Sequence, residues 1–304
     1  MSMQVIESQE WQEIDSVIDS VMKDIELSSR PSYKEAIEQF IGFCVSQGNL
    51  PFRNPHSLFV SYKDYLRDSY RPSTANKKLS AVRKLIKFAA AAGYVTYPQF
   101  AAIENTTNLN DLGGEFRTWL EEDQAQSFFA APDSSTCIGK RDKVAILFML
   151  VLGLRRAEAV SIRWNQIIQQ GEFWLVKDIK GKGGRVRSVK IPTQYMEVLY
   201  DYSEACAGAD PEGYILVHID RHGNHYEALT PRAIGKIVDK YAQQLDYRIT
   251  PHGLRRTCAT LAYRNGADMD MVRQMLGHST EVTTRHYLKD SLYLENAATD
   301  YVGV

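Results

Sequence analysis

A polar segment without periodicity, at residues 104–118, divides the chain into two parts with different patterns. The segment (ENTTNLNDLGGEFRT) contains a Gly-Gly pair and no apolar repeat, which is typical of an interdomain linker. A chain of 304 residues is long enough for two domains. We therefore predict an acidic N-terminal helix at 1–28, a helical domain at 29–105, a linker at 106–118 and a second domain at 119–304.

The first part of the chain carries helical periodicity from end to end. Apolar and acidic residues recur at helical spacing over 7–27, and Ser32 followed by Glu35 predicts a capping box that opens a second helix. A third helix is predicted at 55–70, and a fourth begins at Pro72 with apolar residues at i, i+3 and i+4. We therefore expect this domain to be entirely helical.

The second part combines helices with a small amount of β-structure. Two strand-like stretches flank a glycine-rich turn at 180–184, which predicts a β-hairpin. The predicted strands cover 172–179, 186–191 and 214–218. The predicted helices cover 121–130, 140–152, 193–207 and most of the chain after Thr230. The predicted fold class is mainly α with a small β-hairpin or sheet, in two domains.

Positive charge is concentrated in two short stretches. Seven acids and one lysine at 1–28 leave the rest of a chain of net charge −1 with a net charge of +5. Seven basic residues accompany one acid at 67–87, and six accompany one acid at 177–190. Such clusters predict phosphate contacts from two places, with a solvated surface as the alternative for each. The predicted DNA contacts are Lys77, Lys78, Arg83, Lys84, Lys87, Lys180, Arg185 and Arg187.

No segment indicates export, a membrane span or a metal site. The acidic N-terminus lacks an apolar signal core and no apolar run is long enough to span a membrane, so we expect a cytoplasmic protein. The histidines at 218–225 surround a predicted turn, where helical metal-ligand spacing does not apply. The cysteines form no CxxC pair, which predicts reduced thiols. They are Cys44, Cys137, Cys206 and Cys258.

Four short segments place a charged or hydrogen-bonding residue beside glycine or at a predicted helix start. They are 153–158, the turn around Lys182, 252–257, and Gly277-His278 followed by Tyr287. Each segment alone is typical of a surface or packing residue. Their order and combination, Arg…Lys…His-x-x-Arg…His…Tyr, resembles the tyrosine recombinase (phage integrase) family.

The resemblance extends beyond these positions, over roughly residues 30–290. Arg141 and the apolar helix that leads into Gly-Leu-Arg resemble the family's first catalytic box, and 73–88 resembles the last long helix of its core-binding domain. Two positions depart mildly from the family. Leu152 stands where many members have threonine, and Arg256 stands where many have a second histidine, and neither departure removes a catalytic group.

The resemblance implies that four of these residues bind the scissile phosphate or support its binding. Arg155 and Arg255 would contact the non-bridging oxygens, because guanidinium is permanently charged and donates in pairs. His278 would donate a further hydrogen bond to a phosphate oxygen. Glu158, three residues after Arg155, would lie on the same helix face and hold that guanidinium, or form an ordinary ion pair with it.

The resemblance also implies which groups transfer protons and attack phosphorus. Tyr287 would be the nucleophile, His252 would assist removal of its proton, and Lys182 would protonate the leaving 5′ oxygen. A 3′-phosphotyrosyl link retains the energy of the phosphodiester, so no metal and no other cofactor is expected. The other tyrosines nearby lack the spacing from Gly-His and are expected to pack. They are Tyr263, Tyr293 and Tyr301.

The implied function is site-specific cleavage and rejoining of duplex DNA by an Xer-like or mobile-element recombinase. The two domains would form a clamp around double-stranded DNA, and other protomers would complete a tetramer on two DNA sites. The tail at 288–304 would dock into a neighbouring protomer, or else pack on its own domain. Two other functions use similar residues: DNA relaxation by a type IB topoisomerase, and DNA binding by a regulator without catalysis. The complete catalytic set counts against the regulator.

Overall fold

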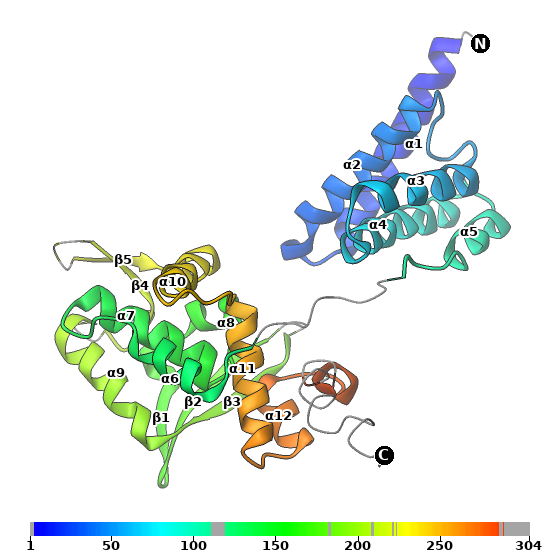
Figure 1. Ribbon diagram of the computed structural model, residues 1–304. Coiled ribbons are helices and arrows are strands. Elements are labelled where there is room, and N and C mark those ends of the chain that lie inside the picture. The colour runs from blue at the N-terminus through cyan, green and yellow to red at the C-terminus, as the bar shows by residue number, and fades with distance from the viewer. Residues whose placement is uncertain are drawn as a thin grey trace, which may run out of the picture. The chain divides into compact units, whose positions relative to one another are not determined.

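The computed structural model separates into two compact units, Met1–Gly114 and Glu115–Val304, which are considered one at a time (Figure 1). The described residues are 3–110, 119–181, 184–207, 210–220, 222, 224–285 and 288, with side chains omitted at 3–8, 28, 206 and 207. Within these ranges, no helix is long and apolar enough to cross a membrane.

The first unit is helical, as the periodicity predicts. Its elements are α1 (Met3–Asp24), a 3-10 turn η1 (Leu27–Ser29), α2 (Arg30–Ser46), α3 (Pro55–Ser69), α4 (Pro72–Ala91) and α5 (Tyr97–Glu104). Helix α4 packs against α1, α2, α3 and α5 and is central to the unit. Its apolar face, including Leu79, Val82 and Leu85, is completely buried. Burial of this face is the main driving force for the unit to fold.

The helices of this unit differ from the prediction in one boundary and in one additional helix. The capping box at Ser32 is wrong, because α2 begins two residues earlier and Ser32 Oγ donates to the Ser29 carbonyl at 2.9 Å. Proline in the first turn of α2 needs no hydrogen-bond acceptor for its nitrogen, so the helix can begin there. The sequence analysis also missed α5, although Thr96 and Gln99 form a capping box at its start.

Residues 105–110 are bound to α4. The Asn76 side chain exchanges two hydrogen bonds of 2.9 Å with the backbone of Leu109. The Arg83 guanidinium donates to the Thr106 carbonyl at 2.6 Å and to Asn108 Oδ1 at 2.9 Å. The first part of the predicted linker therefore packs on the helical unit, whereas 111–118 lies outside the described residues.

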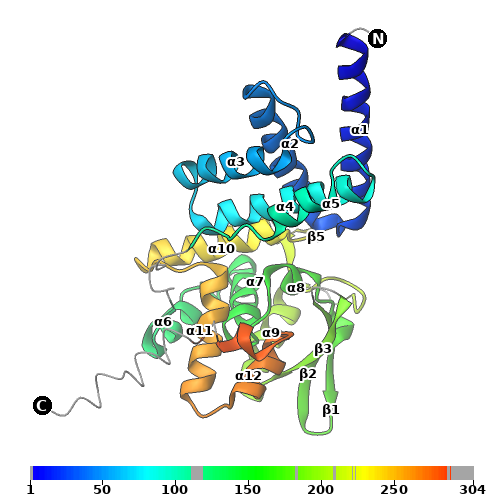
Figure 2. The same cartoon turned by 90° about the vertical axis from the view of Figure 1, so that its right-hand side faces the viewer.

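The second unit mixes helices with two small antiparallel sheets. Its helices and turns are α6 (Glu122–Ala130), α7 (Cys137–Ile146), a π turn η2 (Leu147–Val151), α8 (Arg156–Ser161), η3 (Trp164–Gln166), η5 (Thr193–Tyr195), α9 (Met196–Tyr202), η6 (Ser203–Ala207), α10 (Pro231–Gln244), α11 (Pro251–Arg264) and α12 (Met269–Leu276). Its strands are β1 (Ile167–Gln170), β2 (Phe173–Lys180), β3 (Val186–Ile191), β4 (Val217–Ile219) and β5 (His225–Ala228). Figure 2 shows the β1–β3 sheet beside the helices of this unit.

The predicted hairpin is confirmed and is part of a three-stranded sheet. Strand β2 pairs with β3 and also with β1, a short strand that the sequence analysis missed. The strand predicted at 214–218 is shorter, since β4 begins at Val217 and Tyr214 forms only an isolated bridge with Arg163. The apolar run through α7 and η2 is buried, as predicted, and η2 packs against α11. This packing places α11 next to the turn that leads into α8.

The cysteines differ in part from the expectation of reduced thiols. Cys44 and Cys258 are free and buried, whereas Cys137 at the start of α7 is disulfide-bonded, so the expectation is wrong for Cys137. Burial raises the pKa of both free thiols to about 12. Neither thiol is therefore ionised at neutral pH, and neither is a ready nucleophile.

Candidate functional site

The turn before α8 places Arg155 at the entrance of the site. Gly153 has φ of +60°, and a Cβ built there would lie 2.8 Å from Leu276 Cδ2, so this tight approach requires glycine. Arg155 is the N-cap residue of α8. Its backbone N–H donates to Glu158 Oε2 at 2.8 Å and its Nη1 donates to Glu158 Oε1 at 2.7 Å. The pairing of Glu158 with Arg155 that the spacing predicts is present.

Glu158 is the centre of a buried ion cluster. Among the described residues, three guanidiniums surround its carboxylate: Arg155 at 2.7 Å, Arg187 at 2.8 Å and Arg255 at 3.7 Å. Burial alone would raise the pKa of Glu158, but hydrogen bonds from Arg187 and from the Arg155 backbone outweigh it and lower the pKa to about 2. Glu158 is therefore ionised throughout the physiological range, and it holds guanidiniums from three different elements together.

Arg255 is held inside the unit by backbone carbonyls. It lies on α11, whose N-cap Thr250 accepts from the Gly253 N–H at 3.1 Å. Its guanidinium donates to the Leu276 carbonyl at 2.5 Å and to the carbonyl of Gly153. The side chain is 1% exposed. These contacts connect the start of α8, the first turns of α11 and the end of α12.

His278 follows the C-cap glycine of α12 and is a neutral partner of Arg255. Its Nε2 lies 3.3 Å from Arg255 Nη2, and its Nδ1 lies 3.0 Å from Thr284 Oγ1. Burial, and then the positive charges of the nearby arginines, lower the pKa of His278 to about 4. Because a guanidinium only donates, Nε2 accepts from Arg255 and Nδ1 carries the proton. The sequence analysis expects a hydrogen bond from His278 to a phosphate oxygen, and Nε2 can donate that bond only in the other tautomer.

The low pKa of His278 predicts a specific pH dependence of stability. In the unfolded chain His278 has the ordinary histidine pKa of 6.5, whereas in the folded protein its pKa is about 4. As the pH falls, the unfolded chain therefore takes up this proton before the folded protein does. The contribution of His278 to the free energy of unfolding should therefore fall as the pH falls from 6.5 towards 4, and level off below that. Urea unfolding from about pH 7 down to about pH 4.5 measures this slope.

His278→Gln is expected to reduce this slope, because the buried titrating group is removed. His218→Gln, at an exposed histidine of the same unit, is the matched control and should retain the wild-type slope. A His278→Gln protein with the wild-type slope would show that another group causes the pH dependence.

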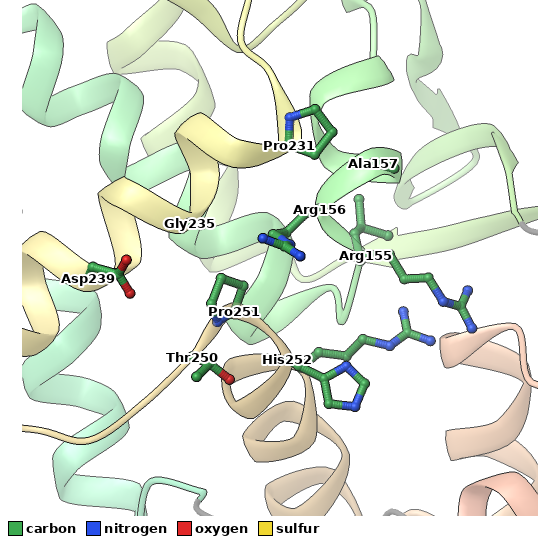
Figure 3. Close-up of a pocket in the computed structure, with 11 residues that line it drawn as sticks. Arg155, Arg156, Ala157, Pro231, Gly235, Asp239, Thr250, Pro251 and His252 are labelled. Carbon is green, nitrogen blue, oxygen red and sulfur yellow. The ribbon is translucent and has the colours of Figure 1, made fainter. Parts of the chain in front are cut away.

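A pocket of about 590 Å³ opens between α8, α10 and α11. Its walls include Arg155, Arg156, His252, Arg255, Gly235 and Asp239. Figure 3 shows the side chains of Arg155 and His252 at the same side of this pocket, although they come from different elements. The structure thus brings together Arg155, His252 and Arg255 beside a space that is open to a ligand. Arg156 and the wall formed by α10 were missed, although the Gly-Leu-Arg-Arg sequence placed a second arginine at this helix start.

The β2–β3 hairpin reaches the ion cluster. A Cβ built on Gly181 would lie 3.5 Å from Glu158 Oε1, so this end of the hairpin lies close to the carboxylate. Lys182 is the next residue and lies outside the described residues. Lys180 and Arg185 are exposed, as expected of phosphate contacts. Arg187 differs from that expectation, because its side chain is only 12% exposed and faces Glu158.

Tyr287 also lies outside the described residues, but residues on both sides of it are placed. Thr284 is buried and contacts His278, as described above. Leu288 is fully buried in an apolar cluster with Val272 and Leu276 of α12. Thr284 and Leu288, which precede and follow Tyr287 in the sequence, therefore both pack close to the end of α12. The competing Tyr293 and Tyr301 lie beyond the described residues.

The basic cluster of α4 is divided between exposed and paired side chains. Lys77 and Lys87 are exposed. Lys78 lies 3.6 Å from a glutamate of α2, and Lys84 lies 2.6 Å from the aspartate that ends α1. Arg83 binds residues 105–110 and lies over the Phe59 ring. Lys77 and Lys87 are thus the most available of the five to an external phosphate, and Arg83 has a structural role within its unit.

The comparisons with known proteins agree with the geometry of the second unit. The model of the phage integrase family matches residues 118–292. Tyrosine recombinase XerD of Lacticaseibacillus casei is 25% identical over 274 residues, which is 88% of this chain and 89% of the relative. Tyrosine recombinase XerC of Bacillus pumilus is 29% identical over 279 residues, which is 86% of each chain.

Solved structures show the same fold. The Tn1549 transposon integrase in complex with circular intermediate DNA has a TM-score of 0.68 and 14% identity, over 90% of this chain and 94% of that one. XerH bound to palindromic difH substrate has a TM-score of 0.68 and 19% identity, over 91% of this chain and 83% of that one. A lambda integrase dimer bound to a core site has a TM-score of 0.66 and 18% identity, over 90% of this chain and 94% of that one.

Proposed function

The chain belongs to the phage integrase family of tyrosine recombinases, and we propose that it carries out site-specific DNA recombination through a covalent 3′-phosphotyrosyl intermediate. The observation that carries the proposal is the arrangement around Glu158. Arg155 and Arg255 come from different helices, yet both contact this buried carboxylate and both line one pocket together with His252.

The arginines supply the electrostatic part of the reaction. Attack on a phosphodiester adds negative charge to the non-bridging oxygens in the transition state. Arg155 is about one-third exposed at the pocket, whereas Arg255 is buried and fixed by carbonyls, so their positions are set before DNA binds. Donors that are already oriented need no reorganisation when the charge develops. We assign both guanidiniums to the scissile phosphate.

The proton transfers are assigned to His252, Lys182 and Tyr287. The Tyr287 oxygen attacks phosphorus while its proton passes to a base, for which His252 is the candidate. The bond from phosphorus to the 5′ oxygen breaks, and Lys182 donates a proton to that oxygen. The product is a 3′-phosphotyrosyl enzyme and a free 5′ hydroxyl. Attack by a 5′ hydroxyl from another strand reverses these steps and completes strand exchange.

Duplex DNA is the proposed partner of both domains. Lys77 and Lys87 on α4, and Lys180 and Arg185 on the hairpin, are the exposed basic residues that fit phosphate contacts. We propose that the helical domain and the catalytic domain clamp the duplex, that phosphate contacts make the affinity salt-dependent, and that groove contacts select the site. We propose that the reaction takes place in the cytoplasm.

A two-site plasmid assay tests the proposed function. The site is first recovered by sequencing genomic fragments that the purified protein retains, and two copies are then cloned into one plasmid. A recombinase deletes or inverts the DNA between the sites, whereas a type IB topoisomerase relaxes plasmids with or without them. Relaxation without exchange would favour the topoisomerase, and binding with neither activity would favour the regulator.

The C-terminal segment is proposed to connect protomers in a tetramer on two DNA sites. An apolar pocket of about 420 Å³ between α6, η2 and α11, with Phe129, Leu150 and Leu261 in its walls, is large enough for apolar side chains of a neighbouring tail. A head-to-tail contact of this kind forms a closed ring when its rotation is compatible with closure. The lambda integrase dimer on its core site shows that a protein of this fold assembles on DNA.

Deleting residues 291–304 is expected to leave single-site DNA binding within a few-fold of wild type and to abolish synapsis and recombination. The tail is assigned to contacts between protomers, so its loss should not affect binding by one protomer. Gel-shift affinity and two-site synapse formation, measured on the same preparation, test this. Normal synapsis by the truncated protein would exclude an exchanged tail, and loss of folding in a thermal melt would assign the tail to its own domain.

A further inference from the structure

Arg187 on β3 turns its side chain away from solvent and onto Glu158. Its Nη2 donates to Glu158 Oε2 at 2.8 Å and its Nη1 donates to Oε1 at 3.2 Å. Its Nε donates to the Met275 carbonyl at 3.0 Å. Each of the three guanidinium nitrogens therefore donates a hydrogen bond to another group of the protein. Through these hydrogen bonds the side chain holds Glu158 and the end of α12 in place.

The close packing around Arg187 also connects three elements of the site. A Cβ built on Gly277 would lie 3.0 Å from Arg187 Cδ, and one built on Gly181 would lie 3.6 Å from Arg187 Nη1. The side chain thus passes between the hairpin, the carboxylate of α8 and the turn that leads from α12 to His278. The absence of a side chain at Gly277 makes room for it.

The positive charge of Arg187 increases the net positive charge that the cluster around Arg155 and Arg255 presents to a phosphate. Glu158 is negative and contacts both of these arginines, so without Arg187 it would cancel one of their two positive charges. Counting the described groups of the cluster, the net charge is +1 without Arg187 and +2 with it. A phosphodiester carries one negative charge, and the phosphorane formed by a phenolate carries two. The additional charge therefore favours the transition state over the ground state.

We propose that Arg187 is a positioning residue for strand cleavage, which neutralises Glu158 so that Arg155 and Arg255 present their full positive charge to the scissile phosphate. This inference rests on the proposed function. It assigns to Arg187 an effect on the rate of cleavage, with little effect on DNA affinity.

A double-mutant cycle that removes the charges of Arg187 and Glu158 tests the proposal. Arg187→Gln, Glu158→Gln and the double variant are compared with wild type in single-turnover cleavage of a nicked duplex that traps the covalent adduct. Loss of one donor that directly contacts a developing anion slows reactions about 10²- to 10³-fold, so Arg187→Gln, one group further away, should slow cleavage about 10- to 100-fold. Gel-shift affinity should change by no more than a few-fold.

The double variant distinguishes charge from structure. Removing both charges returns the cluster to +2, so Glu158→Gln in the Arg187→Gln background should restore most of the lost rate. Lys190→Gln removes an exposed charge from the same strand and is the matched control, expected to cleave at the wild-type rate. A double variant no faster than Arg187→Gln, or an Arg187→Gln variant at the wild-type rate, would overturn the proposal.

Folding and function are checked separately. If a thermal melt shows that Arg187→Gln is unfolded, Arg187→Met and Arg187→Lys provide the comparison. The lysine variant retains the charge and should cleave about tenfold faster than the methionine variant. Equal rates would overturn the proposal. Failure of the wild-type protein to form any adduct would overturn the proposed function itself, and the inference with it.

Discussion

The Tyr287→Phe variant is expected to bind its DNA site as tightly as the wild type and to form no covalent adduct. Phenylalanine retains the ring and its packing but lacks the oxygen that attacks phosphorus. The substitution removes a single oxygen, so the contact of Thr284 with His278 and the burial of Leu288 in its apolar cluster should remain. Trapping on a nicked duplex, followed by a denaturing gel, measures the adduct directly.

Tyr263→Phe is the matched control for this experiment. Tyr263 is a half-buried tyrosine on α11 and lacks the spacing from Gly-His that singles out Tyr287. Its phenylalanine variant should form the adduct normally. A shifted protein–DNA band from Tyr287→Phe would show that another tyrosine attacks, with Tyr293 and Tyr301 as the next candidates.

Lys182→Ala is expected to slow strand cleavage by roughly 10²- to 10⁴-fold, which is typical for loss of a general acid. The 5′ oxygen is a poor leaving group without a proton. Gly181, the residue before Lys182 in the sequence, lies close to Glu158, since a Cβ built on Gly181 would be 3.5 Å from Glu158 Oε1. Single-turnover cleavage rates measure the loss.

A substrate with sulfur at the 5′-bridging position identifies the role of Lys182. Thiolate leaves without protonation, so this substrate should restore most of the rate to Lys182→Ala. Lys180→Ala, at an exposed lysine two residues away on β2, should weaken DNA binding without a rescuable cleavage defect. If the sulfur substrate fails to rescue Lys182→Ala, the lysine is not the acid.

Local patterns predicted those parts of the fold that depend on local interactions. Helix α4 follows from apolar residues at i, i+3 and i+4, and the β2–β3 hairpin follows from alternation around a glycine turn. Strand β1 could not be predicted in the same way. It has four residues, two apolar and two polar in succession, and it pairs only because β2 offers an open edge. Strand formation there depends on tertiary context.

In the site, too, contacts between residues close in sequence could be predicted, whereas contacts that depend on the tertiary fold could not. Glu158 is three residues from Arg155, so their contact follows from helix geometry. Arg187 is 29 residues from Glu158, and its charge alone does not distinguish a phosphate contact from a buried ion pair. The structure distinguishes them through burial and through the carbonyl of Met275. The tautomer of His278 likewise depends on partners that meet only in the folded unit.

The most direct test of the account is to identify the amino acid that becomes linked to DNA. Wild-type protein is trapped on a nicked site, the complex is digested with nuclease and trypsin, and the modified peptide is sequenced by mass spectrometry. Cleavage after Arg285 and Lys289 releases the peptide 286–289. The account predicts that this peptide carries a nucleotide joined through its 3′ phosphate to Tyr287. A 5′-linked nucleotide, or one attached to another residue, would contradict it.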